Sequence, residues 1–221
     1  MATSKRFAST ALSDLIFISP KPAGVPWEEA AAFPVPALTA HQALAEAAPD
    51  PDGEWVLVHG AGGVTGGLVV QLAVARGATV VATAGPSSAA RVAGYGAGLV
   101  LDYHDPEWPI QVREASPERS GVGAAVNAAP GGAALALQAV ADGGRLATIT
   151  GDPPTPERDV TVTDVYVRAD GPALAVLAAA LDEGLLSVDV ATRLPLTDAA
   201  AARSLPRRPR RYPALGTCPR F

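Results

Sequence analysis

The chain has 221 residues, of which 48% are hydrophobic and 18% are charged, and its formal net charge is −5. A chain of this length and apolar content can bury a substantial core, so we expect a soluble globular protein of the α/β class. The net charge is modest and the acidic residues are dispersed, which argues against nucleic acid as a partner.

The N-terminal part contains a short basic pair and a partly apolar stretch that Asp14 interrupts, without a clear small-residue cleavage site. We therefore expect no signal peptide. Trp27 opens a predicted helix that Pro34 and Pro36 end, and a second helix is predicted from Thr39.

From position 55 onward, short apolar strands alternate with helical segments. The predicted strands cover 55–59, 79–84, 98–102, 124–128 and 145–150, with an edge strand at Thr161–Val167. The predicted helices cover 64–76, 87–94, 106–115, 132–141 and 172–183. This alternation is typical of βαβ units and predicts a doubly wound parallel sheet, a Rossmann fold, over residues 25–187. Residues 1–24 are predicted to form an N-terminal arm, the remnant of a second domain, and 188–221 a C-terminal segment.

The stretch from Trp55 to Ala75 has no charged residue and is long enough to suggest a membrane span. Its cluster of glycines argues against that interpretation, because a buried strand that runs through a glycine turn into a helix has the same uncharged appearance. We expect no membrane association.

Glycines at 60, 63 and 66 follow the first predicted strand directly, in the sequence WVLVHGAGGVTGG. Gly60 lets the chain turn off the strand, Gly63 admits a pyrophosphate against bare backbone, and Gly66 allows close packing of helix and strand. The start of the following helix then offers free N–H groups to an anion. The pattern predicts dinucleotide binding, with a glycine-rich packing turn as the alternative.

The choice of dinucleotide depends on the second predicted strand, 79–84. An acidic residue at its end would hold the ribose 2′-hydroxyl of NAD, but no Asp or Glu lies between Glu54 and Asp102. Ser87, Ser88 and Arg91 follow instead, and a guanidinium suits a 2′-phosphate. The sequence therefore favours NADP(H). The alternatives are an ordinary solvated arginine and serines that cap a helix.

Several further stretches join the glycine turn in one recognisable order. They are PKPAGVPWEEAAAFP at 20–34, ALTAHQAL at 37–44, QLA at 71–73, Gly96–Ala97 and Asp102–Tyr103. Over about residues 12–200 the chain thus resembles the medium-chain dehydrogenase/reductase superfamily, in particular its zinc-independent, NADPH-using, quinone-oxidoreductase-like branch.

The resemblance implies a set of cofactor contacts. They are Thr39 near the nicotinamide or phosphates, Thr65 and Gly66 at the pyrophosphate, Tyr103 at the adenosine phosphate, and Asn127 and Gly151 at the nicotinamide half. The branch usually carries a 2′-phosphate lysine where this chain has Ser88, so Arg91 is expected to substitute for it. Val64–Thr65 also stands where Gly-Val is commoner.

The implied activity is that of an NADPH-dependent oxidoreductase that transfers hydride to a quinone, an enone or a carbonyl compound. The resemblance includes only the last piece, Leu12 to Ser19, of the GroES-like catalytic domain, so the catalytic residues are unknown. The rival hypothesis is a non-catalytic NADP(H)-binding or interaction module, or half of a split enzyme. The Arg/Pro tail at 206–213 is expected to be disordered; a displaced reading frame and a genuinely divergent end both explain its composition.

His41, His59 and His104 are isolated and lack metal-ligand spacing, so we expect no metal site and structural roles, with His59 also a candidate cofactor contact. The single cysteine, Cys218, excludes an internal disulfide framework and fits a cytoplasmic location. Members of the family often pair through a sheet edge, so the resemblance implies a homodimer through Thr161–Val167.

Overall fold

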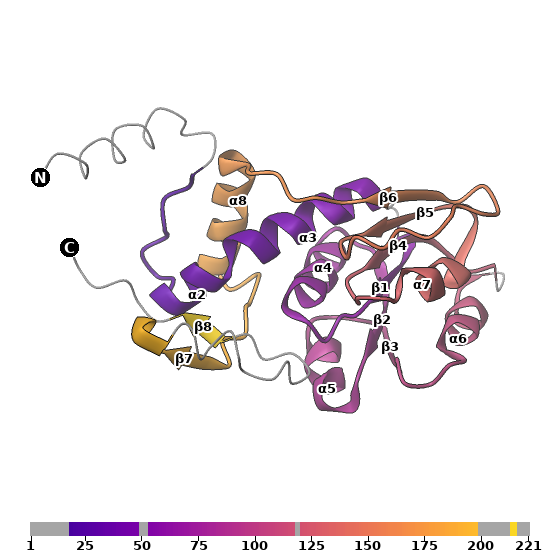
Figure 1. The fold of residues 1–221 in the computed structure, drawn as a ribbon, viewed down its shortest axis with the longest axis horizontal. Helices are drawn as coiled ribbons and strands as arrows, with labels where there is room; N and C mark the ends of the chain where they lie inside the picture. Colours follow the sequence, from indigo (N-terminus) through magenta and orange to yellow (C-terminus); the bar gives the residue numbers. More distant parts are fainter. Residues whose placement is uncertain (1–17, 49–52, 118–119, 199–212, 216–221) are drawn as a thin grey trace, which may run out of the picture.

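The computed structural model describes residues 18–48, 53–117 and 120–198, together with the backbone of 213–215 (Figure 1). At its centre lies a six-stranded sheet in which every pair of neighbours is parallel, in the order β3-β2-β1-β4-β5-β6. The strands are β1 Trp55–His59, β2 Thr79–Ala84, β3 Leu99–Asp102, β4 Val122–Asn127, β5 Val140–Thr148 and β6 Thr161–Asp164. This is the order of a doubly wound Rossmann sheet, so the predicted fold is confirmed.

Helices cover both faces of the sheet. They are α3 Pro34–Ala47, α4 Val64–Ala75, α5 Pro86–Gly94, α6 Trp108–Ala115 and α7 Ala133–Ala139. Two further helices, α2 Trp27–Ala32 and α8 Gly171–Asp182, lie beside the sheet. Val56 and Val58 of β1 pack in the core that includes α3 and α4, whereas Leu57 packs with α6 and α7. All three are fully buried, which explains why β1 is an uninterrupted apolar run.

The uncharged stretch 55–75 is a strand, a turn and a helix of 12 residues. Within the described residues, no helix combines the length and the apolar character that crossing a membrane requires. The interpretation of this stretch as a strand–turn–helix unit is confirmed.

The second helix begins earlier than its sequence pattern predicts. α2 ends at Ala32, but α3 begins at Pro34 instead of Thr39. Pro34 and Pro36 lie in the first turn of α3, where backbone N–H groups have no partner within the helix and the fixed φ of proline is favourable. The prolines therefore start the second helix instead of standing between the two.

A smaller group of elements lies beside the sheet, at the left in Figure 1. It comprises α2, α8, β7 Thr192–Leu194, the 3-10 helix η3 Leu196–Asp198 and β8 Pro213–Leu215, and we call it the side lobe. β7 pairs in parallel with β8, and Arg193 forms an ion pair with Glu28 of α2 at 2.8 Å. Most of the predicted N-terminal arm and of the Arg/Pro tail lies outside the described residues.

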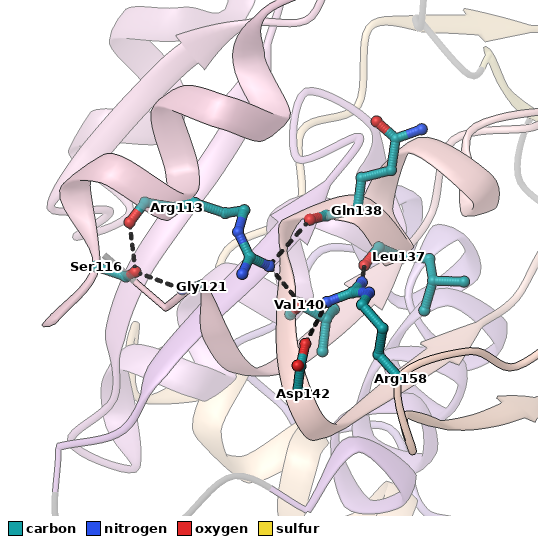
Figure 2. Close-up of polar contacts among 8 residues, drawn as sticks. All are labelled: Arg113, Ser116, Gly121, Leu137, Gln138, Val140, Asp142 and Arg158. Carbon is teal, nitrogen blue, oxygen red and sulfur yellow. Dashed lines mark hydrogen bonds and ion pairs between the residues drawn. The ribbon is translucent and has the colours of Figure 1, made fainter. Parts of the chain in front are cut away.

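Two arginines converge on the end of α7, at the edge of the sheet where β5 begins (Figure 2). Arg113 donates to the carbonyl of Val140 at 2.9 Å, and Arg158 donates to the same carbonyl at 2.8 Å and to that of Leu137 at 2.7 Å. The last carbonyls of a helix lack partners within it, so these guanidinium groups satisfy acceptors that would otherwise be lost.

Arg158 reaches this position from a backbone conformation that is unusual for a side-chain-bearing residue. Its φ is +53°, and that of Asp159 is +57°. Arg158 offsets the steric cost with the two carbonyl bonds and an ion pair to Asp142 at 2.9 Å.

These neighbours therefore predict opposite effects of glycine. Asp159→Gly is expected to raise the free energy of unfolding by up to about 1 kcal/mol, because glycine adopts positive φ without a Cβ clash. Arg158→Gly is expected to lower it by about 2 kcal/mol, because the Leu137 carbonyl loses its side-chain donor and the Val140 carbonyl loses one of two. Equilibrium unfolding in urea measures both changes; equal effects of the two substitutions would contradict the assignment.

Candidate functional site

The glycine turn lies at the carboxyl end of β1. Gly60 has a φ of +87°, and a Cβ atom there would lie 2.9 Å from the backbone of Ala128 and Ala129. Its N–H donates to the Thr83 hydroxyl at 3.0 Å, and the N–H of Ala61 donates to the Thr83 carbonyl at 3.0 Å. Gly60 is required here both by backbone conformation and by space, as its place in the motif predicts.

Helix α4 begins immediately after this turn. Gly63 is its N-cap, and no side chain caps the helix. A Cβ atom on Gly66 would collide with the Gly60 carbonyl oxygen and lie 2.9 Å from the Ala61 Cα atom. Thr65 follows Val64 in the first turn of α4, so the uncapped N–H groups of that turn and the bare glycine backbone lie together, as an anion site requires.

A second group of predicted residues lies beyond the ends of β2 and β3. Arg91 of α5 donates to the Gly62 carbonyl at 3.0 Å, and the Ser88 hydroxyl fills the space where a Cβ atom of Gly62 would lie. The Tyr103 ring lies against Gly85, 3.1 Å from where a Cβ atom would be. The fold thus brings Ser88, Arg91 and Tyr103 to one side of the glycine turn.

Two details of this group differ from the sequence interpretation. The N-cap of α5 is Gly85, so neither Ser87 nor Ser88 caps the helix, and the Ser88 hydroxyl donates to the Gly85 carbonyl at 3.2 Å. Ser87 is exposed on the first turn of α5. The guanidinium of Arg91 is partly engaged by the protein, because it also donates to the Tyr95 hydroxyl at 3.3 Å.

His104 and Asp102 form a polar pair beside Tyr103. The Asp102 carboxylate accepts the backbone N–H of His104 at 3.1 Å and contacts its ring nitrogen Nδ1 at 2.7 Å. The hydrogen bond from the His104 backbone, followed by that from its ring, lowers the pKa of Asp102 below its usual value. The carboxylate at the end of β3 therefore stays ionised and is directed at His104.

Asn127 and Gly151 lie near the ends of β4 and β5, as the resemblance implies. The Asn127 amide is fully buried and donates to the hydroxyls of Thr148 at 3.0 Å and Thr150 at 2.9 Å. Gly151 has a φ of +70°. Asn127, which is a predicted cofactor contact, thus also has a structural role, because it links the ends of neighbouring strands.

Two other polar residues have structural contacts within the protein. The Thr39 hydroxyl donates to the Val35 carbonyl at 2.7 Å, one turn earlier in α3. His59 is 5% exposed, stacks on Trp108 with ring centroids 4.6 Å apart, and contacts the Thr83 hydroxyl at 2.7 Å. Thr83 also accepts the N–H of Gly60, so it belongs to the site. Sequence patterns did not indicate this role, because Thr83 lies in an apolar strand.

Comparison with known proteins assigns the chain to a family. Residues 95–207, about half of the chain, match the zinc-binding dehydrogenase family. The chain belongs to the zinc-binding dehydrogenase family. Its predicted place among the medium-chain dehydrogenases/reductases is confirmed. In the described part of the chain, no three His, Cys, Asp or Glu side chains gather in a way that could hold a metal ion.

Two curated relatives show how far the similarity extends. A zinc-type alcohol dehydrogenase-like protein of Schizosaccharomyces pombe is 29% identical over 166 residues, which cover 69% of this chain and 47% of the relative. A chloroplastic quinone-oxidoreductase homologue of Spinacia oleracea is 45% identical over 92 residues, which cover 39% of this chain and 28% of the relative. The chain therefore spans about half or less of the length of these relatives.

Solved structures agree with the family. An NAD-dependent alcohol dehydrogenase superposes with a TM-score of 0.78 and 30% identity, covering 89% of this chain and 60% of that one. A mycobacterial protein solved in complex with NADPH gives a TM-score of 0.71 and 29% identity, covering 83% of this chain and 62% of that one. The chain thus shares its fold with an NAD-dependent alcohol dehydrogenase and with a protein solved in complex with NADPH.

The contact between α4 and the glycine turn generates a prediction. Gly66→Ala is expected to lower the free energy of unfolding by at least about 2 kcal/mol, because its Cβ atom meets rigid backbone instead of a movable side chain. Gly94→Ala is the matched control, since nothing lies within 4 Å of its Cβ position at the end of α5. Urea unfolding should show Gly94→Ala to be at least as stable as the wild type, because alanine is the better helix former; an equally stable Gly66→Ala would refute the close packing.

Proposed function

We propose that the chain binds NADPH and acts as an oxidoreductase of the quinone-reductase, enoyl-reductase or carbonyl-reductase type. The observation that carries the proposal is the glycine turn, where Gly60 and Gly66 press together under the uncapped start of α4. A pyrophosphate bound there would meet backbone N–H groups and the positive end of the helix dipole. The similarity to a protein solved with NADPH supports the same choice of ligand.

Three features favour NADP(H) over NAD(H). β2 ends at Ala84 without a carboxylate, so the residue type that holds the ribose 2′-hydroxyl of NAD is absent from that position. The Arg91 guanidinium lies beside the Gly62 carbonyl, next to this strand end. Tyr103 and Ser88 line the same side of the turn and add hydroxyl groups for a phosphate.

In the proposed reaction, the nicotinamide of the bound dinucleotide would supply the hydride that is transferred. The residues of this chain bind and orient the cofactor. Asn127 and Thr148 hold the ends of β4 and β5 at fixed separation, and Asp152 accepts the N–H of Gly131 at 2.7 Å. The substrate is proposed to be a quinone, an enone or a carbonyl compound, in the cytoplasm.

A second candidate is a binding half that requires another protein domain for turnover. Trp27 of α2 and Val35 of α3 are 67% and 65% exposed, although both belong to apolar residue types. On this candidate, another domain covers these two exposed side chains. On this candidate the chain binds NADPH without reducing a substrate.

NADPH titration, followed by cofactor fluorescence, tests the proposal. The wild type is expected to bind NADPH more tightly than NADH, and Arg91→Gln is expected to weaken NADPH binding about tenfold or more, because a charged hydrogen bond to the phosphate is lost. The ratio of the two affinities is the decisive quantity, since a change in the turn itself affects both cofactors. The NADP assignment would be overturned if the wild type bound NADPH and NADH equally well and Arg91→Gln did so too.

Two controls complete this test. Arg193→Gln removes the same charge from a side chain that is 66% exposed in the side lobe, and it should leave the affinity ratio unchanged. NADPH oxidation with a panel of quinones and enones separates the two candidate functions. Turnover supports the enzyme, whereas tight NADPH binding without turnover supports the binding half.

We also propose that the chain forms a homodimer through the free edge of β6. β6 is the last strand of the sheet, and Tyr166 and Val167, which follow it, are 73% and 41% exposed. An edge strand leaves backbone groups unpaired, and a second copy can pair with them around a two-fold axis.

Sedimentation velocity tests the dimer. The wild type is expected to sediment as a dimer, and Tyr166→Lys is expected to shift it toward monomer, because a lysine at the edge opposes pairing of like strands. Val176→Lys is the matched control, since Val176 is 71% exposed on α8. A wild type that stays monomeric at high concentration would exclude the dimer.

A further inference from the structure

Asp189, in the segment between α8 and β7, directs its carboxylate toward Arg91, the arginine of the proposed phosphate site. Asp189 Oδ2 lies 3.9 Å from Arg91 Nε, and the two side chains are 65% and 30% exposed. The other two guanidinium nitrogens are directed elsewhere, Nη2 to the Gly62 carbonyl and Nη1 to the Tyr95 hydroxyl. Asp189 therefore faces the Nε side of the Arg91 guanidinium, which bonds neither to the glycine turn nor to Tyr95.

Asp189 is held in this place by a buried glutamine. Gln71 of α4 is 8% exposed, accepts the backbone N–H of Ser187 at 2.8 Å and donates to the Ser187 carbonyl at 3.2 Å. These two bonds fix the chain two residues before Asp189. Because α4 also begins at the glycine turn, Asp189 and the turn are positioned by the same helix.

We propose that Asp189 is a specificity-determining residue that competes with the 2′-phosphate of NADPH for Arg91. The inference rests on the proposed function, since it takes Arg91 as the phosphate contact. At 3.9 Å the pair is too long for a hydrogen bond, and exposed pairs of this kind are weak. A phosphate can thus displace the carboxylate from Arg91, but it then lies near a second negative charge, which lowers the preference for NADPH over NADH.

The experiment is Asp189→Asn, which removes the charge and keeps the shape. NADPH is expected to bind about two- to fivefold more tightly than to the wild type, the range of an exposed ion pair, while NADH affinity stays the same. Calorimetric titration with 2′,5′-ADP and with 5′-AMP isolates the phosphate from the nicotinamide. The gain should diminish at high salt, because exposed charges are screened.

Glu183→Gln is the matched control, because it removes one negative charge from an exposed position at the end of α8. It should leave both cofactor affinities unchanged. The double variant Arg91→Gln/Asp189→Asn should show a smaller gain relative to Arg91→Gln alone, since competition for Arg91 is then absent and only the direct repulsion is relieved.

The outcomes separate this inference from the proposed function. If Arg91→Gln weakens NADPH binding but Asp189→Asn leaves it unchanged or weakens it, Asp189 is at most a support for Arg91 and the inference is wrong. If the wild type does not discriminate between 2′,5′-ADP and 5′-AMP, the NADP assignment fails first. A gain for NADH as large as that for NADPH would also overturn the inference.

Discussion

The close packing of α4 against the turn after β1 is the constraint on which the site depends. Gly66 lies against the Gly60 carbonyl, and Gly60 itself fits against the backbone that follows β4. These approaches place the first N–H groups of α4 directly beyond the end of the sheet, facing the place where the chain leaves β1 and β4. An anion at that point would be bound by geometry that the hydrophobic core fixes, without a charged side chain in the turn.

Polar residues at the carboxyl edge stabilise this arrangement by satisfying one another. Thr83 accepts the N–H of Gly60 and contacts His59, and Asn127 links Thr148 to Thr150. Buried polar groups that are fully bonded specify one arrangement of strand ends. The same networks explain why His59 and Asn127, both polar residues at strand ends, have structural contacts that a motif alone does not disclose.

Local patterns predicted the glycine turn and most strands well, because each depends on residues that are adjacent in sequence. The strand predicted at 145–150 begins earlier, at Val140, and the edge strand predicted at 161–167 ends at Asp164. The strand predicted at 55–59 and the helix at 64–76 are observed at 55–59 and 64–75. The helix predicted at 132–141 ends at Ala139, because Val140 pairs with Val122 of β4 at a long sequence separation. Sequence patterns also did not predict the contacts of Arg91 with Asp189 and of Gln71 with Ser187, because only tertiary packing brings these segments together.

Four arginines lie at two ends of the sheet, and their division bears on how a phosphate would bind. Arg145 donates to the Ala47 carbonyl at the end of α3 and to Glu54, and Arg113 and Arg158 donate to the carbonyls at the end of α7. These three are committed to helix ends at the edge where β5 begins. Arg91 lies instead beside the glycine turn, where its bond to Gly62 fixes one side of the guanidinium and its weak contact with Asp189 leaves the other exchangeable. A cation held in this way would be preorganised for a phosphate, and on our proposal the neighbouring carboxylate adjusts an affinity that depends mainly on the arginine.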